Sequence, residues 1–262
     1  MKFVSIVSAL FLTLSIAACS ASGGSQGAES PTSETRSSNT TVSEADFLET
    51  VAAAHAKHTS AHTHLEVSTD SDTFSMSGPV AWGSDSGDLG LDIASESSQR
   101  SSAIQMIMVG HDFYIKGRAG FPEGKFIRFD LSDEDNQMRK QGAFFERQLS
   151  PSGFIAELES NGAKITAKGD GPTVDGVKTS TWLVSVDPKA LTALSEAIRV
   201  GDKLELTLWL GEDNLLRQLE TPITGGTLTQ SWTEWGKEHV IAAPKKSDTL
   251  DFTQIVGPLS GS

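Results

Sequence analysis

The chain has 262 residues, of which 34 are Asp or Glu and 21 are Lys or Arg, so its formal net charge is −13. This acidic balance is spread along the chain and disfavours nucleic acid, or a bare anionic membrane surface, as a partner. Cys19 is the single cysteine, which excludes an internal disulfide, a thiolate zinc site and a nucleophilic cysteine in the folded part.

Residues 1–18 are a predicted secretory signal peptide. Lys2 precedes an apolar run from Phe3 to Ile16 that is too short to span a bilayer. The next residues, up to Cys19, read IAAC and resemble a bacterial lipobox, in which the cysteine is lipidated and becomes the first mature residue. The alternative is an ordinary signal peptide cut near Ala18. We predict an anchor at Cys19, on the extracytoplasmic face of the cell membrane.

Residues 19–41 are a predicted tether between the anchored cysteine and a folded domain. Ser, Gly, Thr, Ala and Gln dominate this segment, and they cannot offset the entropy of ordering it. A flexible coil of about 22 residues has a typical end-to-end distance of roughly 25 Å. We expect one domain over residues 42–246 and a loosely ordered tail over residues 247–262, which lack a sustained pattern.

Four helices are expected in the domain. Ser43 is the expected N-cap of the first, with Asp46 in a capping-box role and an apolar stripe that ends near His58. The stripe consists of Phe47, Leu48, Val51 and Ala54. The other helices are expected within Ser132–Gln148, from Pro151 to Gly162, and from Pro188 to Gly201 along Leu191, Leu194 and Ile198.

The remaining stretches predict antiparallel strands, because they alternate or run apolar between turn-forming clusters. The clearest is Lys203–Glu220, in which Leu204, Leu206 and Leu208 share one face and Gly211–Asn214 supplies a turn. A return strand over Leu215–Leu219 and a third strand over Thr227–Trp235 complete a meander. The other strands are expected at His64–Thr69, Thr73–Trp82, Leu89–Ser95, Ala103–Gly110, Phe113–Lys116, Lys125–Asp130, Ala163–Lys168 and Val177–Val186, with a turn over Gly169–Pro172 between the last two.

Three motifs in this chain resemble the LppX_LprAFG family of actinobacterial lipoproteins. They are Val174–Val177 (VDGV), Thr207–Leu210 (TLWL) with the acidic turn that follows, and Trp232–Lys237 (WTEWGK) before Val240, Ile241 and Pro244. The resemblance implies an α+β fold, in which an antiparallel half-barrel sheet similar to that of LolA-type carriers wraps over several helices around an apolar cavity. It also implies binding of acylated lipid or glycolipid and its movement through the cell envelope.

The folded part of the sequence lacks enzyme signatures, since the chain contains no HExxH, P-loop or GxGxxG motif and its single GxSxG match, Gly23–Gly27, lies in the predicted tether. We therefore expect a protein that is not an enzyme and has no cofactor. His55, His58, His62 and His64 lie close together, and a zinc or copper site is conceivable because His55 and His58 would share a helix face. The favoured interpretation is exposed polar residues at a helix end, so we predict no metal.

The apolar strand faces are the candidate ligand site. Ile104, Met106 and Met108 share one face of a strand, where thioethers could adapt to acyl chains of different shape. The resemblance implies that the neighbouring strand also lines the cavity. A buried core strand is the alternative, and Trp235–Gly236 is interpreted as a packing and bend feature. The candidate acyl-binding residues are Leu89, Leu91, Ile93, Ile104, Met106, Met108, Leu204, Leu206 and Leu208.

The sequence thus predicts a membrane-anchored lipoprotein that carries acylated lipid or glycolipid within the envelope, with an envelope transporter as a candidate partner. The alternative is an envelope scaffold or accessory protein that acts through protein contacts and fills its cavity with its own side chains.

Overall fold

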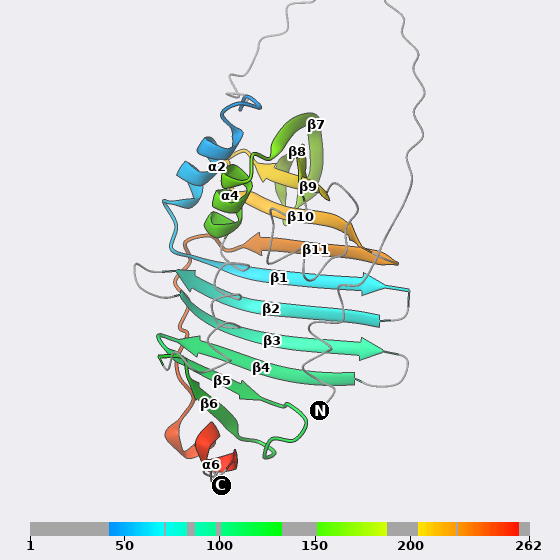
Figure 1. Ribbon diagram of the computed structural model, residues 1–262. Coiled ribbons are helices and arrows are strands. Elements are labelled where there is room, and N and C mark those ends of the chain that lie inside the picture. The colour runs from blue at the N-terminus through cyan, green and yellow to red at the C-terminus, as the bar shows by residue number, and fades with distance from the viewer. Residues whose placement is uncertain are drawn as a thin grey trace, which may run out of the picture.

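The computed structural model describes residues 42–70, 72–82, 87–97, 101–132, 151–187, 204–223 and 225–256. A single 12-stranded sheet dominates these residues, in the order β12-β6-β5-β4-β3-β2-β1-β11-β10-β9-β8-β7 (Figure 1). The sheet is open, since β12 and β7 are its two edge strands. The described part of the fold is therefore mostly β with few helices, and its open sheet is consistent with the expected half-barrel.

Two antiparallel meanders make up eleven of the twelve strands of the sheet. The first contains β1 (Ser60–Thr69), β2 (Asp72–Trp82), β3 (Gly87–Ser97), β4 (Ser101–Val109), β5 (Asp112–Lys116) and β6 (Phe126–Asp130). The second contains β7 (Lys164–Val174), β8 (Val177–Val186), β9 (Leu204–Gly211), β10 (Leu216–Ile223) and β11 (Gly226–Thr233). Antiparallel pairing of β1 with β11, from His62 opposite Thr233 to Thr69 opposite Gly226, joins the two meanders.

The tight turns of the second meander follow the predicted turn chemistry. Asp175 and Gly176 have positive φ angles of 49° and 76° and link β7 to β8 in a two-residue hairpin, a geometry that favours Asp-Gly. Asn214 has φ 61° in the turn between β9 and β10, where its N–H donates to the Gly211 carbonyl at 2.9 Å. The predicted meander is confirmed.

The observed bounds of β7, Lys164–Val174, differ from the predicted ones. Gly169–Pro172 was expected to be a turn between two strands, but it lies inside β7, which continues to Val174. The register with β8 shifts twice along this stretch, between Ala167 and Gly169 and between Asp170 and Thr173. Bulges of this kind let Gly and Pro remain in an edge strand by locally interrupting the ladder. β1 also begins earlier than predicted, at Ser60.

Two helices pack beside the second meander, α2 (Phe47–His55) and α4 (Pro151–Ser160) (Figure 1). Asp46, and not the predicted Ser43, is the N-cap of α2, and its side chain makes no cap hydrogen bond. Ser43 lies one turn earlier, where its Oγ accepts the Asp46 backbone N–H at 3.2 Å. The predicted Pro151 helix is confirmed as α4. The expected helices within Ser132–Gln148 and Pro188–Gly201, and the predicted signal peptide, Cys19 and tether, lie outside the described residues.

The C-terminal segment is more ordered than expected. A 3₁₀ turn (η2, Lys246–Asp248), a strand (β12, Thr249–Asp251) and a short helix (α6, Phe252–Val256) replace the expected loose tail over these residues. β12 pairs in parallel with β6, with Thr249 opposite Phe126. The prediction missed this strand because three residues are too few to show a period. Within the described ranges, no helix combines the length and apolarity needed to cross a membrane.

Candidate functional site

β3 and β4 bring six of the predicted acyl-binding residues together on one face. The strands are antiparallel, and their register places the predicted residues directly opposite one another. Side chains in such cross-strand pairs have Cβ atoms about 5 Å apart, so the six form one continuous apolar strip. The pairs are Leu89 with Met108, Leu91 with Met106, and Ile93 with Ile104.

Exposure changes along this strip. Leu89 and Leu91 are both 2% exposed, and Met108 is 1% exposed. Ile93 and Ile104, nearer the connection between β3 and β4, are only partly buried. The strip thus runs from a fully buried end to a half-buried end.

Neighbouring strands extend the strip with residues that the sequence analysis did not select. Val80 of β2 pairs with Leu89. Met108 pairs with Phe113 of β5, which in turn pairs with Phe129 of β6. Met106 is linked in the same way through Ile115 to Ile127. The period-2 pattern of β5 and β6 could have identified the last four residues, because each alternates with a polar neighbour.

β9 places the other three predicted residues five strands away from β3. Leu204, Leu206 and Leu208 are 2%, 0% and 0% exposed, and β2, β1, β11 and β10 lie between β9 and β3 in the sheet. Trp182 on β8 pairs with Leu208, and its ring lies 4.5 Å from that of Phe47 on α2. This part of the apolar face therefore carries a helix, as an ordinary core does.

A pocket of about 540 Å³ lies elsewhere, where α2 ends near the β9–β10 turn and the residues after β11. Much of its wall is charged, and Arg217 and Asp213 form an ion pair there. Lys57, His58, Asp213, Arg217, Glu234 and Trp235 are among its lining residues. None of the nine predicted acyl-binding residues lines this pocket, and the four charged side chains in its wall do not suit an acyl chain.

The four predicted histidines do not converge on a common point. His55 is the last residue of α2 and is fully buried, which corrects the expectation that it is exposed. Its Nε2 accepts a hydrogen bond from the Leu216 backbone N–H at 3.2 Å. Burial, and secondarily the neighbouring His58, lowers the pKa of His55 to about 4. Among the described residues, no group of three or more His, Cys, Asp or Glu side chains could hold a metal ion.

Trp235 and Gly236 form a tight bend against the end of α2. Gly236 has φ 71°, and a Cβ at this position would lie 2.7 Å from His58 Nδ1. Its backbone N–H donates to the Ser60 carbonyl at 2.8 Å. Both the positive φ and the close approach favour glycine, and the ring contacts of Trp235 with His55, His58 and Trp82 agree with a packing role.

Comparison with known proteins identifies similar folds among solved structures, whereas no family model and no curated protein matches the chain. LprF from Mycobacterium bovis matches with a TM-score of 0.55 and 16% identity, over 76% of this chain and 95% of that one. The lipoprotein LppX from Mycobacterium tuberculosis matches with a TM-score of 0.51 and 12% identity, over 76% of this chain and all of that one. At these identities the likeness shows the fold, and it confirms the structural neighbours that the motifs predicted.

Proposed function

We propose that this chain is a lipid-binding lipoprotein, anchored through Cys19 on the extracytoplasmic face of the cell membrane, that carries acylated lipid or glycolipid within the envelope. The observation that carries the proposal is the apolar strip of β3 and β4, on an open sheet whose fold is similar to LprF and LppX. The proposed role is non-enzymatic: the sequence holds no HExxH, P-loop or GxGxxG motif, and its one GxSxG match lies in the predicted tether and not in the folded domain.

The β3–β4 strip suits an acyl chain better than the β9 leucines do. Three cross-strand pairs side by side span about 13 Å along the strands at 3.3 Å per residue, roughly the length of ten methylene groups. Met106 and Met108 supply unbranched thioethers that adapt to irregular apolar shapes. The β9 leucines lie next to Trp182, whose ring already contacts Phe47.

Ile93 and Ile104 are the proposed mouth of the acyl site. They are the half-buried pair of the strip, and the next pairs outward are Ala94 with Ala103 and Ser95 with Ser102. A lipid bound with its chain along the strip would leave a polar headgroup at these serines, where water or polar contacts can solvate it.

Organic extraction tests the proposal. The full-length Cys19→Ala chain is purified from an envelope-containing host, so that membrane lipid held by an acyl anchor does not contribute. The extract is analysed by mass spectrometry against the protein amount. The proposal predicts acylated lipid at a near-stoichiometric ratio. A protein that is folded and free of lipid, and that captures envelope proteins instead, would favour the scaffold alternative.

A further inference from the structure

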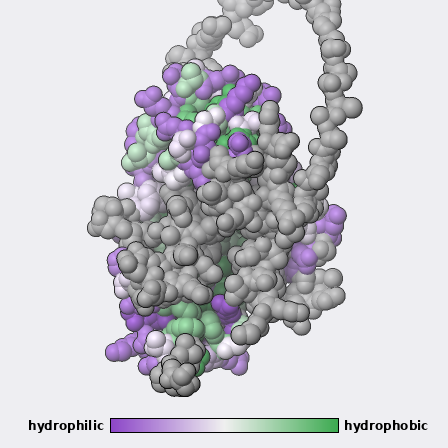
Figure 2. Space-filling view, in the orientation of Figure 1, coloured by the Kyte–Doolittle hydropathy of each residue, from purple (hydrophilic) through white to green (hydrophobic). Residues whose placement is uncertain are grey.

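Aromatic rings gather at the end of the sheet where β5, β6 and the C-terminal segment meet. Phe129 lies at their centre, with its ring 6.4 Å from Phe113, 6.3 Å from Phe121 and 4.7 Å from Phe252. Phe252, on α6, is 39% exposed, one of the large apolar side chains that the described surface leaves open. Figure 2 shows hydrophobic residues at this end, the lower one in the view, between hydrophilic ones.

Basic side chains lie at the same end of the sheet. The Lys116 ammonium lies 5.2 Å from the ring centre of Phe126, and the Arg118 guanidinium lies 5.5 Å from that of Phe121. Lys125 Nζ donates to the Ser247 carbonyl at 2.6 Å, which brings the exposed Lys245 and Lys246 to the same end. Residues 112–130 and 245–251, which form this end, hold these five cations, Arg128 and five carboxylates, so this end carries a net charge of +1 in a chain whose net charge is −13.

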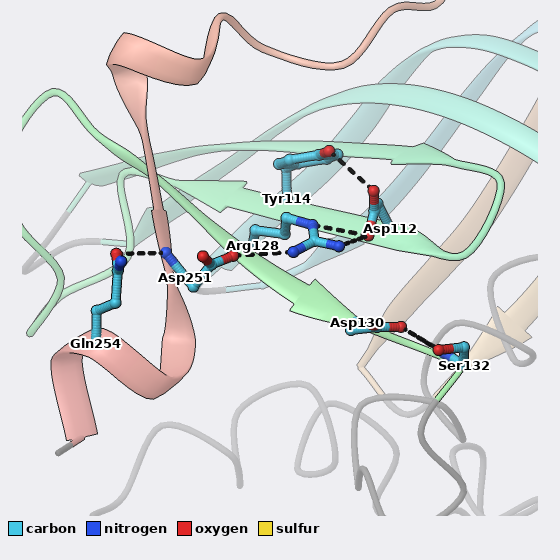
Figure 3. Close-up of polar contacts among 7 residues, drawn as sticks. All are labelled: Asp112, Tyr114, Arg128, Asp130, Ser132, Asp251 and Gln254. Atoms are coloured by element: carbon cyan, nitrogen blue, oxygen red, sulfur yellow. Dashed lines mark hydrogen bonds and ion pairs between the residues drawn. The ribbon is translucent and has the colours of Figure 1, made fainter. Parts of the chain in front are cut away.

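Arg128 does not add to the positive charge of this end, because it is paired with two carboxylates and the three groups together carry a charge of −1 (Figure 3). Its guanidinium donates to Asp251 at 3.0 Å and to Asp112 at 2.8 Å. These hydrogen bonds, that of Asp251 foremost, raise the pKa of Arg128 above its ordinary value. Arg128 thus joins β12 to β5 and β6, and it holds Phe252 and Lys245–Lys246 beside the aromatic rings.

We propose that this basic-aromatic end docks on the surface of an anionic membrane through the exposed Phe252, the partly exposed Phe121 and the five cations, with the buried Phe113 and Phe129 packed beneath them. Basic residues near such a surface contribute additively to the free energy of membrane binding. An exposed aromatic ring can enter the membrane interface beside them. The Debye length is about 8 Å at physiological salt. Carboxylates at the far edge of the sheet are therefore screened from a surface that this end touches, despite the acidic balance of the chain.

The reach of the predicted tether is compatible with this docking, a step that rests on the proposed anchor at Cys19. Twelve strands spaced about 4.8 Å apart make a sheet roughly 53 Å wide. Residues 20–41, fully extended at about 3.4 Å each, span about 75 Å. The α2 end, which follows the tether, and the α6 end lie at opposite ends of the sheet (Figure 1). An extended tether can therefore bring the α6 end to the membrane that holds the anchor.

Vesicle binding tests the docking surface without reference to any bound ligand. The full-length Cys19→Ala chain is sedimented with vesicles of phosphatidylcholine alone or of phosphatidylcholine mixed with phosphatidylglycerol. All variants share residues 1–41, so the apolar N-terminus contributes equally, and the difference between the two vesicles isolates the anionic component. Lys245→Glu/Lys246→Glu should weaken binding to the anionic vesicles by roughly tenfold or more.

Lys164→Glu/Lys168→Glu is the matched control, because it makes the same charge change at two exposed lysines on β7, the opposite edge of the sheet. This variant should bind like the parent, and Phe252→Ala should bind less tightly to the anionic vesicles. Equal losses in both lysine variants would mean that only net charge matters and would overturn the proposal. A parent that shows no preference for the anionic vesicles would overturn it as well. Because no step needs bound lipid, a failed extraction experiment leaves this test intact.

Discussion

The imidazole of His55 stacks on the indole of Trp235, with ring centres 4.8 Å apart and planes inclined by 19°. The contact joins the last residue of α2 to the bend after β11, which lies 180 residues further along the chain. His55 also accepts the Leu216 N–H, while its Nδ1 is buried with no hydrogen-bond partner among the described residues. A neutral imidazole suits this site, and a protonated one would place an uncompensated charge in the core.

His55 should make the protein less stable as the pH falls. Its pKa is about 4 in the folded protein, against 6.5 for the ordinary side chain. The unfolded state therefore binds the proton first, and the free energy of unfolding falls as the pH drops from about 6.5 to about 4, by up to about 3 kcal/mol. Urea unfolding at a series of pH values measures this loss.

His55→Phe retains a stacked ring but removes both the titration and the acceptor for Leu216. At neutral pH it should cost about 1 to 3 kcal/mol, because the Leu216 N–H loses its partner. Its disadvantage relative to the parent should shrink below pH 6.5. His64→Gln is the control, since His64 is 46% exposed, and it should leave the pH profile unchanged. If the free energies of unfolding of the parent and of His55→Phe changed in parallel with pH, that result would contradict the assignment of His55 as a buried, neutral imidazole.

Arg128→Ala should release the C-terminal segment while leaving most of the fold in place. The ion pairs of Arg128 with Asp112 and Asp251 are partly exposed, with side-chain exposures of 33% to 47%. Such pairs contribute only about 0 to 1 kcal/mol each, so global stability should fall slightly. Hydrogen exchange in residues 246–256 should instead accelerate clearly. Arg118→Ala removes a nearby cation that lies over the Phe121 ring and not against Asp251, so unchanged exchange is expected. Equal acceleration in this variant would show that Arg128 is not the specific link.

Leu91→Trp should distinguish whether the β3–β4 strip lines a cavity or belongs to a solid core. If the β3–β4 strip lines a space for acyl chains, the larger ring fills it, lipid co-purification is lost and the fold survives. In a solid core the same overpacking costs about 1 to 3 kcal/mol or more. Leu206→Trp is the matched comparison in the part of the face near α2, and it should destabilise in either case. Bound lipid and thermal stability are measured together; a badly destabilised Leu91→Trp, from a parent without lipid, would reject the carrier function.

Cys19→Ala should abolish stable anchoring. Two or more acyl chains, at about 0.8 kcal/mol per buried methylene, hold a protein firmly where one chain is marginal. The variant is expected in the medium or as an unprocessed precursor, as judged by cell fractionation and intact mass. Normal processing with firm membrane association would contradict lipidation at this residue.

The sequence alone determined the local features of this protein. Period-2 alternation predicted both bounds of β8, Val177–Val186, and the buried leucine face of β9, because strands with one buried face must alternate. Turn chemistry placed Asn214 where a positive φ is needed. The same alternation predicted the β3 and β4 faces, whose six residues proved to be directly paired.

Only the tertiary structure decided which of these local pieces meet. Pairing of β1 with β11, burial of His55 under Trp235, and addition of β12 to β6 each join residues more than 100 positions apart. No local pattern in the sequence encodes such a contact, since its free energy depends on the surface that the partner offers once both segments are folded. β12 shows this most clearly: Thr249–Asp251 is too short to alternate, and it is a strand because the edge of β6 supplies its hydrogen bonds and Arg128 binds Asp251.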